Sequence, residues 1–443
     1  MSQTDALYGG LAESAGDPAA LSAYAAFAHR ILRIAPGAEE ILEMRRQMPD
    51  EPVLALGEAL FWLFGQTAEA QQACAEALAK AEASALDETQ TRWLGALQLW
   101  HAHDFDRAAS AFEEITSEDP TDLTAAKACE FVYYILGQQH CGPRFRTHMQ
   151  RLSPQYAGNP DFLAMHAFAH ELCGEMGPAR TAAEQALEIE PLQPWAHHAL
   201  EHVLLWEGNP EAAMQLMKNW ARDWEACARP IHSHNAWHYA VALLDRLEVS
   251  AAFEVFDTHV WMKTPGVVTE QLDTVSFLWR VEMAGHEVPR SRWDTLLPVV
   301  QQASGELFMP FASAHYAYAL ARGGGMAAAE PLLAAVAERS AMADAEAVRV
   351  WRPTGRHVVE ASAALGCGRV REAADAFDTA RPRLTEIGGS DAQDDLFRFA
   401  HMTSLAASGR QSAARELLAS RLTSKPASPL EEHWMQSFSI PTP

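Results

Sequence analysis

Three pairs of histidines, each with a spacing of four residues, are the part of the sequence best suited to carry chemistry. The pairs are His166 and His170, His198 and His202, and His234 and His238. Two residues four apart on an α-helix lie on one face, with Cβ atoms about 6 Å apart, so both imidazoles can reach one ion. The pattern therefore predicts a divalent metal site, with zinc or iron as the ion.

The second pair also encloses a carboxylate. His198-Ala199-Leu200-Glu201-His202 reads H-x-x-E-H, a string found in inverted zinc peptidases, in which the glutamate is the general base. His259 and Asp257 stand at the end of a later helix and add one imidazole and one carboxylate. Glu201 and Asp257 are therefore the predicted acid–base residues. The predicted metal ligands are His198, His202, His234, His238 and His259.

Further residues are expected to line the same pocket. They are His166, His170, Trp237, Asp273 and His315. Whether His315, which comes much later in the chain, reaches the central histidines depends on how the chain curls back.

A structural explanation of the same histidines competes with the metal site. Tryptophans are frequent in this stretch, and a buried neutral imidazole can be satisfied by a carboxylate or a backbone carbonyl. Each ring nitrogen left without a partner costs about 1–3 kcal/mol, so several unmet imidazoles in adjacent units would be expensive. Metal-free acid–base catalysis by the imidazoles is a third alternative.

The elements that must position these residues are repeated helices. The three pairs begin 32 and 36 residues apart, on either side of the roughly 34-residue tetratricopeptide period. One copy of that pattern has Trp93-Leu94-Gly95, Ala108, Phe112 and Pro120. Small residues let the two helices of a repeat approach closely, and proline ends the second helix. We therefore expect an all-α, tetratricopeptide-like superhelix.

The chain is predicted to be one continuous helical-repeat domain over residues 1–443. Its parts are N-terminal repeats (16–158), histidine-rich central repeats (159–262), C-terminal repeats (263–425) and a tail (426–443). Helices are expected over 19–34, 38–47, 53–65 and 67–85, loops at 263–270 and 386–393, and a tight turn at Gly323-Gly324-Gly325. The Pro/Ser-rich tail is expected to dock loosely or fray.

Composition limits the classes of partner. The chain has 58 acidic and 34 basic residues, a formal charge of −24, which repels phosphate backbones and anionic lipid. Nucleic acid and membranes are therefore not expected partners. Met1–Asp5 lacks the basic and apolar pattern of a signal peptide. The six cysteines contain no CxxC motif and suit a reducing cytoplasm. The oligomeric state stays open.

Several of these segments together resemble the tetratricopeptide repeat protein 38 family. The resemblance is carried by Trp195, His198 and His202, by His234-Asn235, Trp237-His238 and Asp257-Thr258-His259, by Ala314-His315 and by Gly388–Asp394 with Phe397. It is strongest over residues 159–423. It implies an all-α repeat superhelix in the cytosol, and the family has no well-established reaction. His166, His170 and Glu201 lie outside its pattern, which weakens the peptidase-like interpretation.

Two functions follow as hypotheses. The first is a metal-dependent enzyme, of hydrolase or lyase type, that acts on a small polar molecule. The second is a non-catalytic scaffold that binds a peptide or protein partner. A peptide-binding groove should carry basic or asparagine-rich residues, and the acidic sequence indicates few of them.

Overall fold

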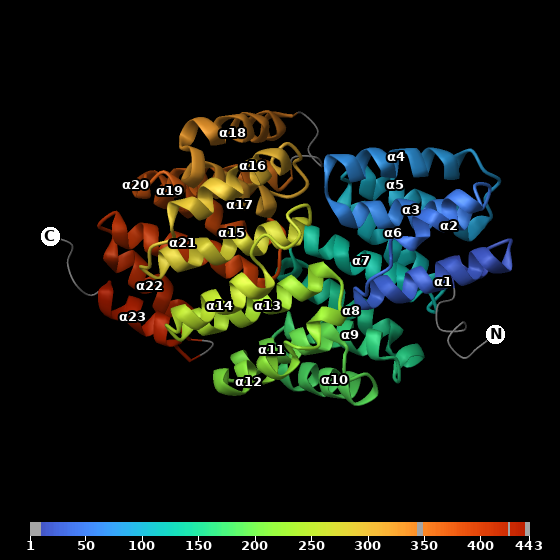
Figure 1. The fold of residues 1–443 in the computed structure, drawn as a ribbon, viewed down its shortest axis with the longest axis horizontal. Helices are drawn as coiled ribbons and strands as arrows, with labels where there is room; N and C mark the ends of the chain where they lie inside the picture. Colours follow the sequence, from blue (N-terminus) through green and yellow to red (C-terminus); the bar gives the residue numbers. More distant parts are fainter. Residues whose placement is uncertain (1–9, 343–348, 424–425, 439–443) are drawn as a thin grey trace. The chain divides into compact units, whose positions relative to one another are not determined.

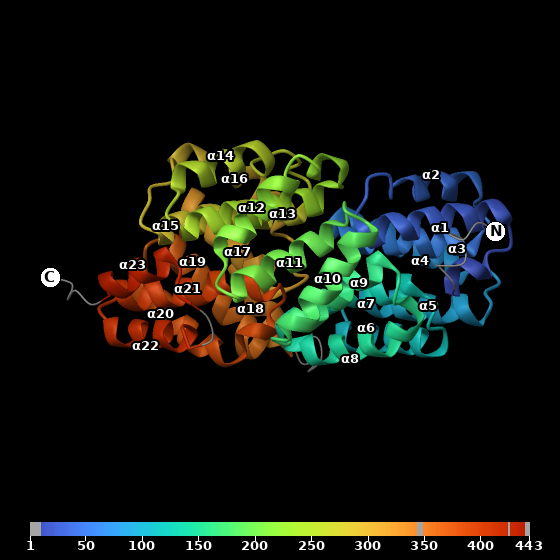
Figure 2. The same ribbon diagram turned by 90° about the horizontal axis from the view of Figure 1, so that it is seen from below.

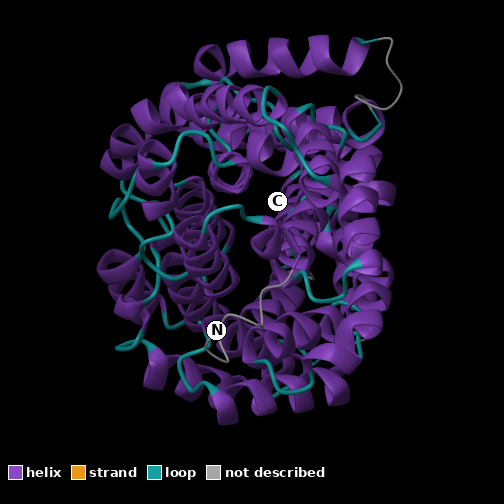
Figure 3. Ribbon diagram, turned by 90° about the vertical axis from the view of Figure 1, so that its right-hand side faces the viewer, coloured by secondary structure: helices purple, strands orange, loops and turns teal. Residues whose placement is uncertain are grey.

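The computed structural model describes residues 10–342, 349–423 and 426–438. The described residues form 23 α-helices with short turns, and Figure 3 shows no strand among them. The all-α helical-repeat class predicted from the sequence is confirmed. None of the described helices is both long enough and apolar enough to cross a bilayer. The N-terminal segment Met1–Asp5 lies outside the described residues.

The chain divides into two compact units. Unit 1 consists of Met1–Leu136, Cys141–Leu200 and Asp223–Ile231, and unit 2 of Gly137–His140, Glu201–Arg222 and His232–Pro443. The division falls inside three helices: α8 (Gln138–Tyr156), α11 (Pro194–Trp206) and α13 (Arg229–Asp245). The repeat boundaries expected from the sequence stay a prediction.

Unit 1 is built from antiparallel helix pairs that follow one another in chain order, such as α3 with α4 and α5 with α6 (Figure 1). Its helices are α1 (Pro18–Arg33), α2 (Glu40–Gln47), α3 (Pro52–Gly65), α4 (Ala68–Glu82), α5 (Glu88–His101), α6 (Phe105–Glu118), α7 (Leu123–Leu136), α9 (Pro160–Glu171) and α10 (Met176–Ile189).

The repeat pattern explains how these helices pair. Trp93 on α5 and Phe112 on α6 are buried and meet edge to face, with ring centroids 5.5 Å apart. Ala108 at the crossing is fully buried. Asp17 caps α1 through a 2.6 Å hydrogen bond from Ala19 N–H to Oδ1, so the helix begins one residue before the expected start at residue 19.

Unit 2 is also built from helices that pack on their neighbours in the chain, such as α19 with α20 and α21 with α22 (Figure 2). Its helices are α12 (Pro210–Trp220), α14 (Val249–His259), α15 (Val268–Met283), α16 (Arg290–Ala303), α17 (Pro310–Gly324), α18 (Met326–Ala341), α19 (Arg356–Gly366), α20 (Val370–Ala380), α21 (Asp391–Ala407), α22 (Gln411–Arg421) and α23 (Pro429–Ser437).

Two of the expected turns are shorter than predicted. Gly323 and Gly324 complete α17, and Gly325 alone, with φ of 75°, separates α17 from α18. Ser390 begins α21 with a capping box, in which Ser390 and Gln393 each accept a hydrogen bond from the other's backbone N–H.

The tail differs from expectation. Residues 429–437 form α23, which buries Leu430 and Trp434. The indole of Trp434 donates a 3.3 Å hydrogen bond to the Met283 carbonyl at the end of α15. This described part of the tail is therefore packed, because an amphipathic turn follows its prolines. Residues 439–443 lie outside the described residues.

Candidate functional site

Unit 2 contains a cavity of about 540 Å³. Its walls come from the second half of α11, from α13, α15, α21 and α22, and from the 3₁₀ segment Arg381–Glu386. A cavity of this size suits a small molecule rather than a folded domain. Only residues of unit 2 line it.

Three cavity-lining side chains have the arrangement of a metal site. Glu201, His202 and His238 each offer a ligand atom, and these atoms all lie within 4.8 Å of one another. Oε2 of Glu201 is 3.3 Å from Nδ1 of His238 and 4.0 Å from Nε2 of His202. The three residues are 1–4% exposed, so a bound ion would be held in a largely dry pocket.

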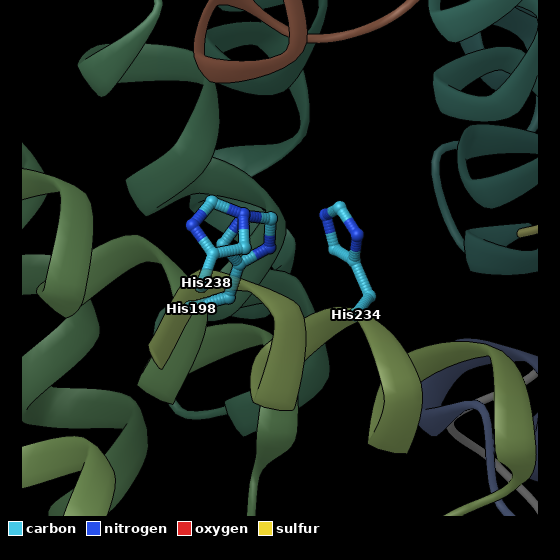
Figure 4. Close-up of side chains that lie close together, drawn as sticks. All are labelled: His198, His234 and His238. Atoms are coloured by element: carbon cyan, nitrogen blue, oxygen red, sulfur yellow. The ribbon is translucent and has the colours of Figure 1, made fainter. Parts of the chain in front are cut away.

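Two helices supply this set. Glu201 and His202 are neighbours in the second half of α11, while His238 projects from α13. The rings of His202 and His238 meet with centroids 4.8 Å apart. Figure 4 shows His234 and His238 on the same side of α13, one turn apart, together with His198 from α11.

Two carboxylates lie near the Nδ1 atoms of histidines in unit 2. Oδ1 of Asp391, at the start of α21, is 3.8 Å from Nδ1 of His202. Oδ1 of Asp273, on α15, is 3.1 Å from Nδ1 of His234. Burial raises the pKa of Asp273, and the neighbouring His234 acts in the opposite direction. Carboxylates in this position fix the orientation and tautomer of a metal-binding histidine.

Four arginines also line the cavity, and two of them are neutralised by carboxylates. Arg398 donates to Asp395 Oδ1 at 3.0 Å and to Gln139 Oε1 at 2.6 Å. Arg421 donates to both oxygens of Asp395, at 2.6 and 2.5 Å, and to Glu431 at 2.7 Å. Burial alone would lower the pKa of Arg421, but Asp395 and Glu431 raise it above its usual value. The other two are Arg280 and Arg381.

Several residues predicted for the site lie elsewhere in unit 2. Asp257 is exposed and forms a two-pronged ion pair with Arg292, at 2.7 and 2.9 Å. Nδ1 of His259 lies 3.1 Å from Nε2 of His232. His315 is buried against aromatic rings, and its Nδ1 is 2.9 Å from the Phe311 carbonyl. None of the three sequence-predicted residues lines the cavity.

Unit 1 holds the remaining predicted residues. The rings of His166 and His170 have centroids 4.4 Å apart, and Nδ1 of His170 is 2.5 Å from Glu175. His198 packs its ring against Phe168 and Trp195. Burial lowers the pKa of His166 to about 4, so it is neutral at pH 7. Trp237, in contrast, is in unit 2 and lines the cavity.

The sequence interpretation missed Asp391 and Arg280. Asp391 belongs to the Gly388–Asp394 segment, whose capping pattern was visible but whose spatial neighbours were not. Arg280 lies in a helix whose residues from Glu270 to Val281 are buried, and it carries no motif of its own. A buried arginine in such a helix is itself a signal, because arginine is almost never fully buried without a reason.

A second group of possible ligands, in unit 1, has a structural explanation. Glu113, Cys129 and His148 have ligand atoms within 4.8 Å of one another. Glu113 accepts hydrogen bonds from Arg144 at 2.6 Å and from Tyr133, and burial raises the pKa of the Cys129 thiol. A carboxylate already paired with arginine and a thiol held protonated make a poor metal site.

Comparisons with known proteins add little to the geometry. No family model matches the sequence. A solved structure described as Naa15/Naa10 bound to HypK-THB is similar at 12% identity, with a TM-score of 0.23. The match covers 95% of this chain and 66% of that one, so the chain spans just under two thirds of the similar protein.

Proposed function

We propose that the chain is a metal-dependent enzyme, of hydrolase or lyase type, that acts on a small polar molecule in the cavity of unit 2. The observation that carries the proposal is the convergence of Glu201, His202 and His238 on the wall of that cavity. Two imidazoles and one carboxylate are a ligand set used for catalytic zinc and for non-haem iron(II).

Glu201, His202 and His238 would hold the metal beside the cavity. A metal held by these three residues would lower the pKa of a bound water and polarise a substrate carbonyl. The chain's own contribution is to orient His202 through Asp391 and to hold the set among buried side chains. Asp391 also lines the cavity and can accept a proton from a substrate or a water.

This proposal changes the residue set expected from the sequence. It keeps His202 and His238 as ligands and moves Glu201 from general base to ligand. It leaves out Asp257, because Arg292 already engages its carboxylate on the surface. His234 acts as a support beside His238, since its ring lies 4.8 Å from that of His238 and is held by Asp273.

One observation favours a scaffold as the second candidate. The four arginines of the cavity are the kind of basic lining that the sequence did not indicate and that would bind an acidic peptide end. A scaffold needs no metal, so metal content separates the two functions. Membership of the tetratricopeptide repeat protein 38 family and a cytoplasmic location remain part of the proposal; all six cysteines are free, which agrees with that location.

Elemental analysis of untagged protein tests the enzyme hypothesis. We expect close to one zinc or iron per chain in the wild type and a loss of most of it in His202→Ala and His238→Ala. His401→Ala is the matched control, because His401 lines the same cavity but is engaged by Asp378 at 3.0 Å. Metal far below one per chain in the wild type, or equal retention in all variants, would contradict the proposal.

A further inference from the structure

Arg280 on α15 differs from Arg398 and Arg421 because it forms no direct ion pair, and the charges of Asp245 and Asp395 act on it only from beyond ion-pair distance. It is 5% exposed. No carboxylate oxygen of the described residues lies within 4 Å of its guanidinium, whereas Arg398 and Arg421 both pair with Asp395. Burial lowers the pKa of Arg280, and the charges of Asp245 and Asp395 oppose this effect only in part. Burying an arginine without a direct ion pair is costly, so its place in this wall calls for a reason beyond packing.

The guanidinium is fixed in position without being saturated. Its Nη2 donates a 2.8 Å hydrogen bond to the Ala392 carbonyl, and its Nε makes a longer contact, of 3.4 Å, with Ser276 Oγ. It lies over the rings of Trp237 and Phe399, at 5.6 and 5.7 Å from their centroids. A guanidinium has five N–H groups, so its Nη1 end has no acceptor among the described residues.

Arg280 shares the cavity with the proposed metal ligands. Glu201, His202 and His238 lie on the α11 and α13 walls, and Arg280 lies on the α15 wall. Trp237, which its guanidinium covers, is the residue next to His238 and meets its ring at a centroid distance of 4.7 Å. Arg280 and the proposed ligands therefore border the same cavity of about 540 Å³.

The charges of the cavity favour an anion once a metal is bound. Four arginines are balanced by four carboxylates in the lining, namely Glu201, Asp245, Asp391 and Asp395. A divalent ion would make the lining positive by two charges, although the whole chain carries −24. A singly charged group such as a carboxylate can accept hydrogen bonds from the open Nη1 end of this one guanidinium.

Building on the proposed function, we propose that Arg280 binds a carboxylate group of the substrate and holds the rest of the molecule toward Glu201, His202 and His238. The substrate class is then a small carboxylic acid. The carboxylate is the anchor and does not react; the reacting bond lies on the side of the molecule that faces the metal ligands. Binding energy from such a remote group is used to orient the reacting one.

Calorimetric titration of the full chain with simple probes tests this inference. The probes are acetate, succinate and glutarate, their neutral amides, and inorganic phosphate, at constant ionic strength. We expect at least one carboxylate to bind the wild type, and its amide to bind at least about tenfold more weakly, because a charge-assisted bond is lost. Preference for phosphate over every carboxylate, or equal binding of acids and amides, would overturn the carboxylate assignment.

Substitutions identify the anchor. Arg280→Met should weaken carboxylate binding at least about tenfold, and Arg280→Lys should weaken it less, because it keeps the charge but loses the fork. Arg381→Met removes an equal charge from the same cavity and should change the affinity by less than about threefold. Equal losses in the two methionine variants would show general attraction instead of an anchor. Circular dichroism checks that each variant is folded. If Arg280→Met does not fold, the carboxylate affinity of Arg280→Lys is the test of the anchor.

The same titrations separate this inference from the metal hypothesis. Each is run on protein treated with a chelator and on protein reloaded with zinc. Arg280-dependent carboxylate binding in the absence of zinc supports the anchor even if the metal proposal fails. Zinc uptake should be the same in Arg280→Met and the wild type, since Arg280 is not a ligand. Normal zinc uptake with carboxylate binding unaffected by Arg280→Met would reject the anchor alone.

Discussion

The carboxylate of Asp391 lies 3.8 Å from Nδ1 of His202, on the far side of the imidazole from Glu201. The distance exceeds that of a hydrogen bond, yet it places a negative charge where it favours a proton on Nδ1. The lone pair is then on Nε2, which faces the proposed ligand set. α21 thus supplies the orienting group for a histidine on α11.

This relationship predicts the effect of Asp391→Asn on metal affinity. Removing the carboxylate should weaken metal binding about 10- to 100-fold, the usual effect of losing such a supporting group. Competition with a chromophoric chelator measures it. Asp245→Asn is the control, because it takes the same charge from the same cavity lining. Equal losses in both variants would mean that net charge, and not orientation, governs affinity.

The helices could be predicted from the sequence because their signals are local. Trp93, Ala108 and Phe112 have the spacing of one tetratricopeptide helix pair. Asp17 and Ser390 are recognisable in the sequence as helix caps. The same-face placement of His234 and His238 follows from the four-residue spacing alone. The fold class and the elements that carry the histidines therefore required no structure.

The far wall of the cavity could not be predicted in this way. Arg280 and Asp391 meet the histidines through the packing of α15 and α21, which the local pattern of neither helix encodes. Glu201 lies outside the pattern of the family that the sequence resembles. Glu201 nevertheless stands within ligand distance of two histidines. Long-range packing decided which of the repeated histidines share one cavity.

Glu431 is predicted to decide whether α23 stays docked. One of its oxygens accepts a 2.9 Å hydrogen bond from Ser428 N–H at the start of α23, and the other accepts from Arg421 on α22 at 2.7 Å. Glu431→Ala removes both contacts and should destabilise α23 by about 2–4 kcal/mol, since it also leaves Arg421 underpaired. Glu431→Gln keeps a capping oxygen and should cost about half as much.

Hydrogen exchange of the amides of residues 429–437 measures this difference. Protection should fall in the order wild type, Glu431→Gln, Glu431→Ala, with little change in α21. Exposed Glu432 on the same helix provides the control, as Glu432→Ala should leave protection unchanged. Identical protection in all four proteins would show that packing of Trp434 alone holds the helix.

His148 predicts acid sensitivity of unit 1. Burial lowers its pKa to about 4, with Glu113 opposing and Arg151 and Arg144 adding to the effect. The unfolded state, with a pKa near 6.5, binds a proton first. The contribution of His148 to the free energy of unfolding is therefore complete above about pH 6.5. It is lost as the pH falls toward 4, by up to about 3 kcal/mol. Urea titrations at several pH values give the free energy of unfolding of the wild type and of His148→Gln. This free energy should depend less steeply on pH in the variant, and an equal pH dependence in both proteins would contradict the assignment.

From the environment of Asp122 we expect stability to change with pH in the opposite direction over a similar pH range. Its Oδ1 accepts Ala125 N–H at 2.9 Å at the start of α7, and its Oδ2 accepts the Trp93 indole N–H at 2.8 Å. Burial raises its pKa to about 6, although these hydrogen bonds act to lower it. The folded state then binds the proton more tightly than the unfolded state. This group's contribution to stability is therefore complete below about pH 4 and is lost as the pH rises to 6.

Asp122→Asn separates this contribution from that of His148. The amide cannot titrate, so in this variant the free energy of unfolding no longer contains the contribution that falls between pH 4 and 6. The contribution of His148, which rises over the same range, is then unopposed, and the free energy of unfolding should rise more steeply with pH than in the wild type. It should also be less stable at pH 7 by about 1–3 kcal/mol, because an amide nitrogen facing Trp93 N–H replaces an acceptor with a donor. Urea unfolding followed at pH 4, 5, 6 and 7 measures both effects. An unchanged pH profile would mean that Asp122 is ionised in the folded state throughout this range, with its hydrogen bonds outweighing the cost of burial.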